Sequence, residues 1–295
     1  MPKKMSNSKN TPIPLKEKRI PVVILRGGGD LASGVAARLH RVGIKIIITE
    51  LAQPLAVRRL VSFCEAMYRH EIVVEGITAK VAPDTNSVVR TLAAHQIPVL
   101  VDAEMEIRNA PQLDVCALID ARMMKRPPEL APSGVPWKEY FSLMIGLGPG
   151  FFAGENCHVV IETNRGHYLG RAIWDGEPQA DTGIPGAVAS QRAERVLRSP
   201  ADGILANYSE IGERVVVGQA LASVDGQPIV APFDGILRGL LHQGLEVRQG
   251  MKVGDVDPRD DPKNAFTISE KALAIGGGVL EALLTRPEIR AKLWN

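Results

Sequence analysis

The chain has 295 residues, 45% of them hydrophobic and 23% charged, and a formal net charge of +2. No apolar run approaches the roughly 20 residues that a membrane helix needs, and so small a net charge gives no basis for nucleic-acid binding. The cysteines, Cys64, Cys116 and Cys157, lie far apart without CxxC spacing, which argues against a disulfide framework or a metal site. We therefore expect a globular protein of the reducing cytoplasm that binds neither membranes nor nucleic acid.

The first elements alternate between strand and helix after a polar start. Residues 1–19 are rich in Lys, Asn and Pro and lack the apolar segment of a secretory signal, so they predict a flexible tail. Ile20–Leu25 is an apolar strand, and Leu31–Val42 carries apolar residues at the spacing of one helix face. Ile44–Ile48 predicts a second buried strand, and Gln53–Tyr68 predicts a helix.

The following segments continue the same alternation. A helix is predicted over Ser87–His95, and further short strands over Ile72–Val74, Pro98–Val101 and Val115–Ile119. Leu143–Leu147 is apolar and is followed by Gly148–Gly150, which interrupts the run. Fully apolar strands that alternate with helices are typical of a parallel, doubly wound sheet. We therefore predict a Rossmann-like α/β domain over residues 20–190.

A glycine run follows the first strand and opens the first predicted helix. Its spacing, GxGxxA from Gly27 to Ala32, suits a tight turn, close approach of backbone N–H groups to a phosphate, and the helix N-terminus behind it. A carboxylate for ribose hydroxyls is expected about 20 residues further on. The candidate cofactor-binding residues are therefore Gly27, Gly28, Gly29, Asp30, Leu31, Ala32, Ser33 and Glu50. The alternative is a strand–helix turn without a ligand, and Asp30 would either cap the helix or repel a phosphate.

Two other polar pairs leave their roles open. Arg58 and Arg59 lie on the helix predicted after Glu50, where at most one can face a ligand and a solvated face is the alternative. Asp120 and Arg122 follow the Val115–Ile119 strand at the edge where parallel sheets bind ligands, and they could equally form a loop ion pair.

A polar hairpin closes the α/β domain. His158–Thr163 and His167–Trp174 predict two strands joined by the three residues Asn164–Gly166. If the faces of these strands coincide, their charged side chains converge in a site for an anionic ligand or for proton transfer. The candidate catalytic residues are Glu162, Arg165, His167 and Arg171. Surface ion pairs on an edge hairpin are the alternative.

The last third of the chain contains an internal repeat. Residues 200–225 align with residues 232–257 without a gap, and ten positions carry the same residue 32 positions apart. This indicates one β unit used twice about a pseudo-twofold axis. We place this duplicated β-module at residues 191–258. A C-terminal segment, residues 259–295, holds a predicted helix over Ser269–Leu284, in which Gly276–Gly278 either break the helix or permit close packing.

The β-module resembles the biotinyl/lipoyl-type barrel-sandwich hybrid, whose halves are related in the same way. Carrier members of that fold hold a lysine at the central hairpin, which here is Val224–Pro228 and contains none. The resemblance therefore implies an unmodified relative used for docking or structure, with no covalent biotin or lipoate.

Five further motifs identify the chain from Ile20 to Leu284 as similar to the YqeB-type accessory proteins of selenium-dependent molybdenum hydroxylases. They are RGGGDLASG, ELAQPLAVRR, GLGPGF, ETNRGHYLGR and GGGVLEA, which begin at residues 26, 50, 146, 162 and 276. The resemblance implies a role in hydroxylase maturation, with a dinucleotide ligand such as NAD, FAD or molybdopterin dinucleotide, and a hydroxylase client or other maturation proteins as partners. A homo-oligomer remains an option. A nucleotide-dependent oxidoreductase and a non-enzymatic scaffold are the alternative functions, and whether the chain is an enzyme stays open.

Overall fold

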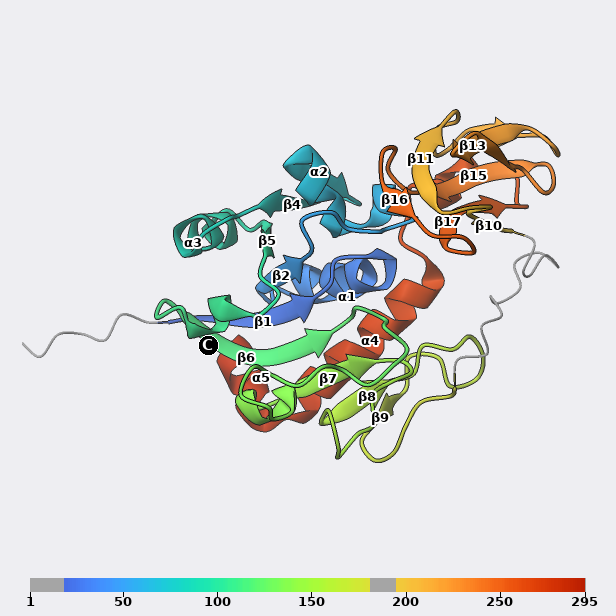
Figure 1. Cartoon of the computed structure of the whole chain (residues 1–295). Helices are drawn as coiled ribbons and strands as arrows, with labels where there is room; N and C mark the ends of the chain where they lie inside the picture. The colour runs from blue at the N-terminus through green and yellow to red at the C-terminus, as the bar shows by residue number, and fades with distance from the viewer. Residues whose placement is uncertain (1–18, 181–194, 295) are drawn as a thin grey trace, which may run out of the picture.

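The computed structural model describes residues 19–180 and 195–294 (Figure 1). The tail predicted at residues 1–19 lies, apart from Arg19, outside the described residues, as does the predicted boundary between residues 190 and 191. None of the helices in the described ranges is long and apolar enough to cross a membrane.

A nine-stranded sheet forms the centre of the larger part of the protein, in the order β3-β4-β5-β2-β1-β6-β7-β8-β9. Its strands are β1 Ile20–Arg26, β2 Ile46–Glu50, β3 Glu71–Val74, β4 Ile77–Val81, β5 Ile97–Val101, β6 Leu113–Asp120, β7 Met144–Leu147, β8 Val159–Ile161 and β9 Ala172–Ile173. The strands from β4 to β8 pair in parallel, and β3 and β9 add antiparallel edges. A parallel-rich sheet of this order is compatible with the predicted Rossmann-like class.

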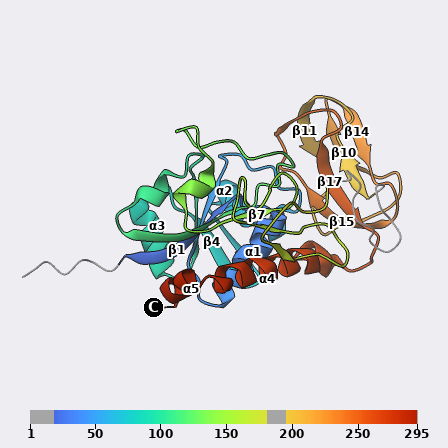
Figure 2. The same cartoon turned by 90° about the horizontal axis from the view of Figure 1, so that it is seen from below.

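The apolar residues of the central strands divide between two cores, one on each face of the sheet. On β1, Val23 and Leu25 join the core under helix α1 (Asp30–Arg41), whereas Val22 and Ile24 join the core under α3 (Thr85–Ala93). This is the period-2 alternation of a strand buried on both sides. Helices α4 (Glu270–Thr285) and α5 (Pro287–Leu293) share the face of α1, as Figure 2 shows.

Helices α1 and α4 approach each other closely because glycine stands at their contact. A Cβ atom at Gly34 would lie 2.5 Å from Cβ of Ala272, and one at Gly276 would lie 2.7 Å from the carbonyl oxygen of Gly34. Helix α4 runs unbroken through Gly276–Gly278, capped by the Ser269 hydroxyl, which accepts from the N–H of Ala272. The predicted helix over Ser269–Leu284 is confirmed, and its glycines serve packing.

The helix predicted over Gln53–Tyr68 is wrong. The segment instead forms two 3₁₀ turns, η1 (Arg59–Val61) and η2 (Phe63–Glu65), and the short helix α2 (Ala66–Arg69). Its backbone is bound to the glycine loop: the N–H of Cys64 donates to the carbonyl of Gly28, and that of Phe63 donates to the Ser33 hydroxyl. N–H groups used in this way cannot support a continuous α-helix, so tertiary contacts override the apolar periodicity.

The predicted three-residue hairpin at Asn164–Gly166 is also wrong. Strands β8 and β9 pair Val160 with Ile173 and Ile161 with Ala172, so the connection runs from Glu162 to Arg171. Within it the backbone turns at Gly166 and Gly170, which have φ angles of 136° and 80°. Such angles favour glycine, and they end the strand that alternation had predicted from His167.

The β-module consists of two four-stranded antiparallel sheets, β10-β17-β15-β12 and β14-β13-β11-β16. The strands are β10 Val196–Arg198, β11 Gly203–Asn207, β12 Arg214–Val215, β13 Ala220–Val224, β14 Gln227–Val230, β15 Gly235–Leu240, β16 Glu246–Val247 and β17 Lys252–Asp257. Exchanging the equivalent strands of the two repeats converts one sheet order into the other, as a twofold-related duplication requires. Asp225 and Gly226, both with positive φ, turn the central hairpin between β13 and β14.

The β-module is inserted between β9 and α4 and packs on the Gln53–Tyr68 segment (Figure 1). Val57 lies against Gly239, where a Cβ atom would be 2.8 Å from the Val57 carbonyl oxygen. Arg59 donates to the Leu240 carbonyl at 3.1 Å, and the His242 imidazole bonds to the buried Glu65 carboxylate at 2.7 Å. The Gln53–Tyr68 segment therefore forms the surface on which the β-module packs.

Three further 3₁₀ turns lie in the connections between elements. Of these, η3 (Glu106–Asn109) and η4 (Trp137–Tyr140) lie in the sheet crossovers, and η5 (Pro262–Ala265) links β17 to α4.

Candidate functional site

The glycine loop turns the chain from β1 into α1, and its three glycines have different environments. Gly27 has a φ of 93° and donates to the Thr49 carbonyl at 2.8 Å. Gly28 is enclosed, since a Cβ atom there would lie 3.0 Å from the backbone nitrogen of Cys64. Gly29 faces open space, with no atom within 4 Å of a Cβ built on it. Only Gly29 therefore leaves room for a ligand to reach the loop.

The Glu50 carboxylate lies under this loop at the end of β2. Its Oε2 accepts from the N–H of Gly28 at 2.6 Å, and its Oε1 accepts from the N–H of Leu51 at 2.8 Å. Burial raises the pKa of Glu50, while these two N–H donors partly oppose the rise. Each carboxylate oxygen retains a second lone pair, so Glu50 can hold the loop and still accept from a ligand hydroxyl.

A cavity of about 650 Å³, the glycine-loop cavity, opens at the carboxyl ends of β1, β2 and β6. Its volume lies in the range of small-molecule sites, roughly 300–1,000 Å³. Leu51 and Leu55, which are 58% and 49% exposed, give it an apolar wall beside Glu50. Arg122, which also lines the cavity, donates to the Asp120 carboxylate from Nε at 3.0 Å and from Nη2 at 2.7 Å. Asp120 and Arg122 thus form an ion pair, of which the arginine faces the cavity.

Two polar groups of the cavity wall suit a phosphorylated ligand. Helix α1 begins at Gly29 without a side-chain cap, so its first-turn N–H groups remain available to an anion. The Thr49 hydroxyl is buried in the wall and, within the described residues, has no hydrogen-bond partner. The Ser33 hydroxyl, by contrast, is used internally, since it donates to the Gly28 carbonyl at 3.2 Å.

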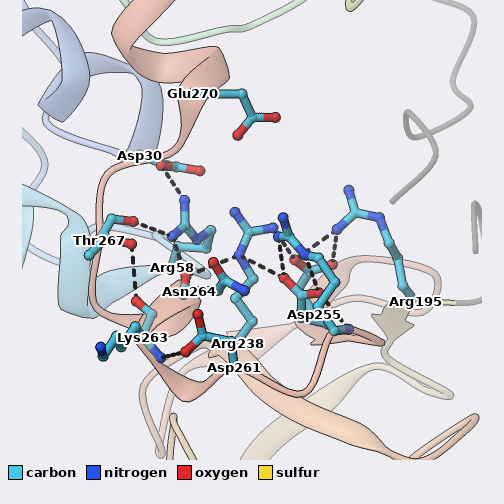
Figure 3. Close-up of polar contacts among 12 residues, drawn as sticks. Asp30, Arg58, Arg195, Arg238, Asp255, Asp261, Lys263, Asn264, Thr267 and Glu270 are labelled. Atoms are coloured by element: carbon cyan, nitrogen blue, oxygen red, sulfur yellow. Dashed lines mark hydrogen bonds and ion pairs between the residues drawn. The ribbon is translucent and has the colours of Figure 1, made fainter. Parts of the chain in front are cut away.

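Asp30 at the start of α1 is neutralised by a buried arginine. Arg58 Nη1 lies 2.9 Å from the Asp30 carboxylate, and Nη2 donates to the carbonyls of Asn264 and Thr267 at 3.0 and 2.8 Å (Figure 3). The sequence suggested that this carboxylate would cap the helix or repel a phosphate; the ion pair removes most of the repulsion. Neither Arg58 nor Arg59 lies on a solvated helix face, because both bind the segment that carries the β-module.

A second cavity, of about 430 Å³, lies between the β-module and the α/β part; we call it the inter-module cavity. Eight cationic side chains and two carboxylates, Asp30 and Asp255, line it. The cations are Arg58, Lys125, Arg165, Arg195, Arg198, Arg238, Lys252 and Lys271. It shares Asp30, Leu31 and Met123 with the glycine-loop cavity, so the two cavities are adjacent.

Ion pairs inside the β-module fix part of this basic wall. Arg195 Nη1 lies 2.8 and 3.0 Å from the two oxygens of Asp255, and Arg238 lies 3.6 Å from the same carboxylate (Figure 3). Desolvation is the largest cause that lowers the pKa of Arg238, Lys252 and Lys271, and a neighbouring arginine lowers each pKa further. Asp30 opposes the pKa shift in all three. With eight cations and two carboxylates in its lining, the inter-module cavity carries a net positive charge.

The four residues predicted to be catalytic are not brought together. Glu162 is 1% exposed and accepts from the N–H groups of Asn164 and Gln179, at 2.6 and 2.7 Å, so its carboxylate holds the loop. Arg165 pairs with Glu270 and is the only one of the four that lines a cavity described here. His167 and Arg171 are exposed, and both contact the ring of Tyr168.

Sequence reasoning missed the cations of the β-module, although the repeat contains a signal for them. Arg238, Lys252 and Asp255 stand where the first copy of the repeat has Ala206, Ala220 and Ser223. Charged residues that stand in one copy alone are not required by the fold that the two copies share. Comparing the copies position by position would have found these three residues, but not the partners that the other elements supply.

Most of this chain is similar in sequence to a curated protein. No family model matches the chain. It is 41% identical, over 263 residues, to an uncharacterized protein named YqeB from Escherichia coli (strain K12), and the match covers 89% of this chain. The similarity supports a YqeB-type family. The chain spans about half, 47%, of the length of that relative.

Solved structures show only distant likeness. An aspartoacylase family protein from Mesorhizobium loti shares 13% identity with a TM-score of 0.27, over 83% of this chain and 87% of its own. The ectoine utilization protein EutE (DoeB) from Ruegeria pomeroyi shares 11% identity with a TM-score of 0.22, over 81% and 86% of the two chains. Likeness at this level carries no argument about function. Within the described ranges, no group of three or more His, Cys, Asp or Glu residues is arranged to hold a metal ion.

Proposed function

We propose that the glycine-loop cavity binds a nucleotide, or the dinucleotide part of the molybdenum cofactor, and that the chain acts as an accessory protein in the maturation of a selenium-dependent molybdenum hydroxylase. The observation that supports the ligand is the cavity at the uncapped start of α1, with Gly29 open to it and Glu50 beside it. The maturation role is supported by the resemblance of the five motifs to YqeB-type accessory proteins.

Each part of the cavity has a role in this proposal. The N–H groups at the start of α1 bind a phosphate, and Gly29 allows it to come close. The free lone pairs of Glu50 accept from the ribose hydroxyls. Leu51 and Leu55 offer the base an apolar surface.

The β-module completes the proposed accessory protein. We assign it to the biotinyl/lipoyl-like barrel-sandwich hybrids, on the basis of its duplicated sheets and two-residue central turn. In this role it docks the hydroxylase client and carries no covalent biotin or lipoate. The oxidoreductase alternative gains no support, since His167, its expected catalytic residue, lines neither of the two cavities.

The test combines calorimetric titration with the substitution Gly29→Ala. The titrated ligands are NAD, FAD, CDP and GDP derivatives and molybdopterin dinucleotides. A methyl group at Gly29 meets no protein atom within 4 Å and its φ of −71° suits alanine, so the fold tolerates it. The same methyl group obstructs a phosphate, and a steric cost of about 1–3 kcal/mol weakens binding by about 5- to 150-fold.

The matched control is Gly277→Ala, which adds a methyl group to another open glycine, distant from the cavity. This control retains wild-type affinity. If no ligand of the panel binds, or if Gly29→Ala binds the ligand as tightly as Gly277→Ala does, the proposed nucleotide binding in the glycine-loop cavity is wrong.

A further inference from the structure

We propose that the inter-module cavity is a binding site for a phosphorylated anion with two or more negative charges, such as pyrophosphate or the pyrophosphate of a nucleotide. The nucleotide source rests on the function proposed above, and the free anion does not. The proposal gives the β-module a direct part in ligand binding, because it supplies Arg195, Arg198, Arg238 and Lys252 to the cavity.

The excess of positive charge cannot be explained by contacts between the modules alone. Asp255 is shared by Arg195 and Arg238, and Asp30 is matched by Arg58. Glu270 pairs with Arg165 from outside the lining. In the part of the chain that the structure describes, neither Lys252 nor Lys271 forms a hydrogen bond or an ion pair within 4 Å, although Asp255 attracts Lys252 and Asp30 attracts Lys271 from further away. Mutual repulsion among cations in a confined space costs stability, and a bound polyanion relieves it.

Three arginines of the basic wall are buried and fixed in place, whereas Arg198 and Lys252 are exposed at its edge. Arg58 and Arg238 are each 6% exposed, and Arg195 is 9% exposed. Their guanidinium groups are fixed by carboxylates and backbone carbonyls from both modules (Figure 3). A site of fixed donors binds an anion without the entropic cost of ordering three long side chains.

Two helix N-termini add to the positive potential. Asp30 and Leu31 at the start of α1, and Ser269 and Lys271 at the start of α4, all line the cavity. A lysine in the first turn of a helix opposes the helix dipole and is therefore unfavourable in the unliganded protein. An anion between Lys271 and Lys252 makes both the lysine and the helix end favourable.

The dimensions and position of the cavity indicate a small ligand that reaches the glycine loop. Its volume of about 430 Å³ is too small for a nucleic-acid duplex but accommodates two phosphate groups. The shared residues Asp30, Leu31 and Met123 place it next to the glycine-loop cavity. One ligand can therefore hold its nucleoside and a first phosphate at the glycine loop and extend a further phosphate into the inter-module cavity.

The test titrates sodium pyrophosphate into the full-length protein at low ionic strength. Lys252→Gln and Lys271→Gln each weaken binding by about 10- to 150-fold, because each removes a charge-assisted hydrogen bond to the anion. The matched control is Lys80→Gln on β4, an exposed lysine outside both cavities, which leaves binding unchanged. Lys271→Gln in addition leaves the melting temperature unchanged or raised, because it removes a cation from a helix N-terminus.

Absence of pyrophosphate binding, or equal affinity in all three lysine variants, overturns the proposal. A free polyphosphate and a nucleotide are distinguished as the source of the anion by titrating nucleoside monophosphates and pyrophosphate-containing nucleotides into Lys252→Gln and into the wild type. A loss confined to the pyrophosphate-containing nucleotides supports the nucleotide as source, and a loss confined to free pyrophosphate supports a free polyphosphate. Lysine-dependent pyrophosphate binding with no nucleotide binding refutes the ligand half of the proposed function alone. Nucleotide binding that depends on Gly29 but not on the lysines refutes the inter-module site alone.

Discussion

Three consecutive glycines in α4 provide an internal test of how closely α1 and α4 pack. Gly276 faces α1, Gly278 faces the backbone of Gly170, and Gly277 is exposed with no atom within 4 Å of a Cβ atom built on it. Alanine in place of glycine inside a helix is favourable by about 1 kcal/mol at each position. Differences among the three alanine variants therefore report the steric contacts alone.

The expected order follows from these contacts. Gly277→Ala raises the free energy of unfolding by up to about 1 kcal/mol. At Gly276 the added methyl group lies 2.7 Å from the Gly34 carbonyl oxygen, and overpacking of about 1–3 kcal/mol offsets that gain. The unfolding free energy of Gly276→Ala should therefore lie about 1–3 kcal/mol below that of Gly277→Ala. Gly278→Ala meets a backbone carbonyl still more closely and should lose at least as much.

Urea unfolding followed by far-UV circular dichroism measures all three variants against the wild type. The order Gly277→Ala, wild type, Gly276→Ala, Gly278→Ala supports the packing described. Equal stabilisation by all three substitutions would falsify it, because the helices would then have to lie further apart than the structure shows.

Two further predictions concern buried charges. Arg58→Ala leaves Asp30 without its partner and two carbonyls without donors, so we expect the free energy of unfolding to fall by about 3 kcal/mol. The control Arg41→Ala removes a partly exposed ion pair and should change the free energy of unfolding by about 0–1 kcal/mol. Similar losses for the two variants in urea unfolding would contradict this expectation. Burial raises the pKa of Glu50, and a ribose hydroxyl donates a stronger hydrogen bond to the carboxylate than to the neutral carboxyl group, so nucleotide affinity should rise as the pH increases through that raised pKa and become level above it. Calorimetric titrations across this range should show no such rise in Glu50→Gln, and an identical profile in both proteins would rule out the ribose contact.

The sequence predicted those parts of the fold that depend on local pattern. Apolar runs such as Ile20–Leu25 and Ile44–Ile48 become central parallel strands, and the spacing of Leu31–Val42 becomes α1. The repeat predicted equivalent β units, and the structure has equivalent sheets. The Gln53–Tyr68 helix failed because its N–H groups are used by the glycine loop, a contact that no local pattern reveals.

The candidate site was predictable only where its residues are close in sequence. Gly29 and Glu50 lie at the ends of neighbouring strands, so their motif was sufficient to place them beside one cavity. The inter-module cavity draws Arg58, Arg165, Arg238 and Lys271 from four separate segments, and only the docking of the β-module brings them together. The catalytic roles assigned to Glu162, Arg165, His167 and Arg171 stay predictions, made on a hairpin register that the Gly166 and Gly170 turns exclude.

The contact between α1 and α4 also has a consequence for biosynthesis. Gly34 meets Ala272, so the helix that covers the first α/β unit emerges from the ribosome only after the whole β-module has been translated. At roughly 5–20 residues per second, the apolar face of α1 waits roughly 10–50 s for its partner. During that interval Gly34 and Val35, which lie against Gly276 in the folded chain, have no α4 to cover them. The nascent chain therefore leaves this face of α1 uncovered for most of its synthesis.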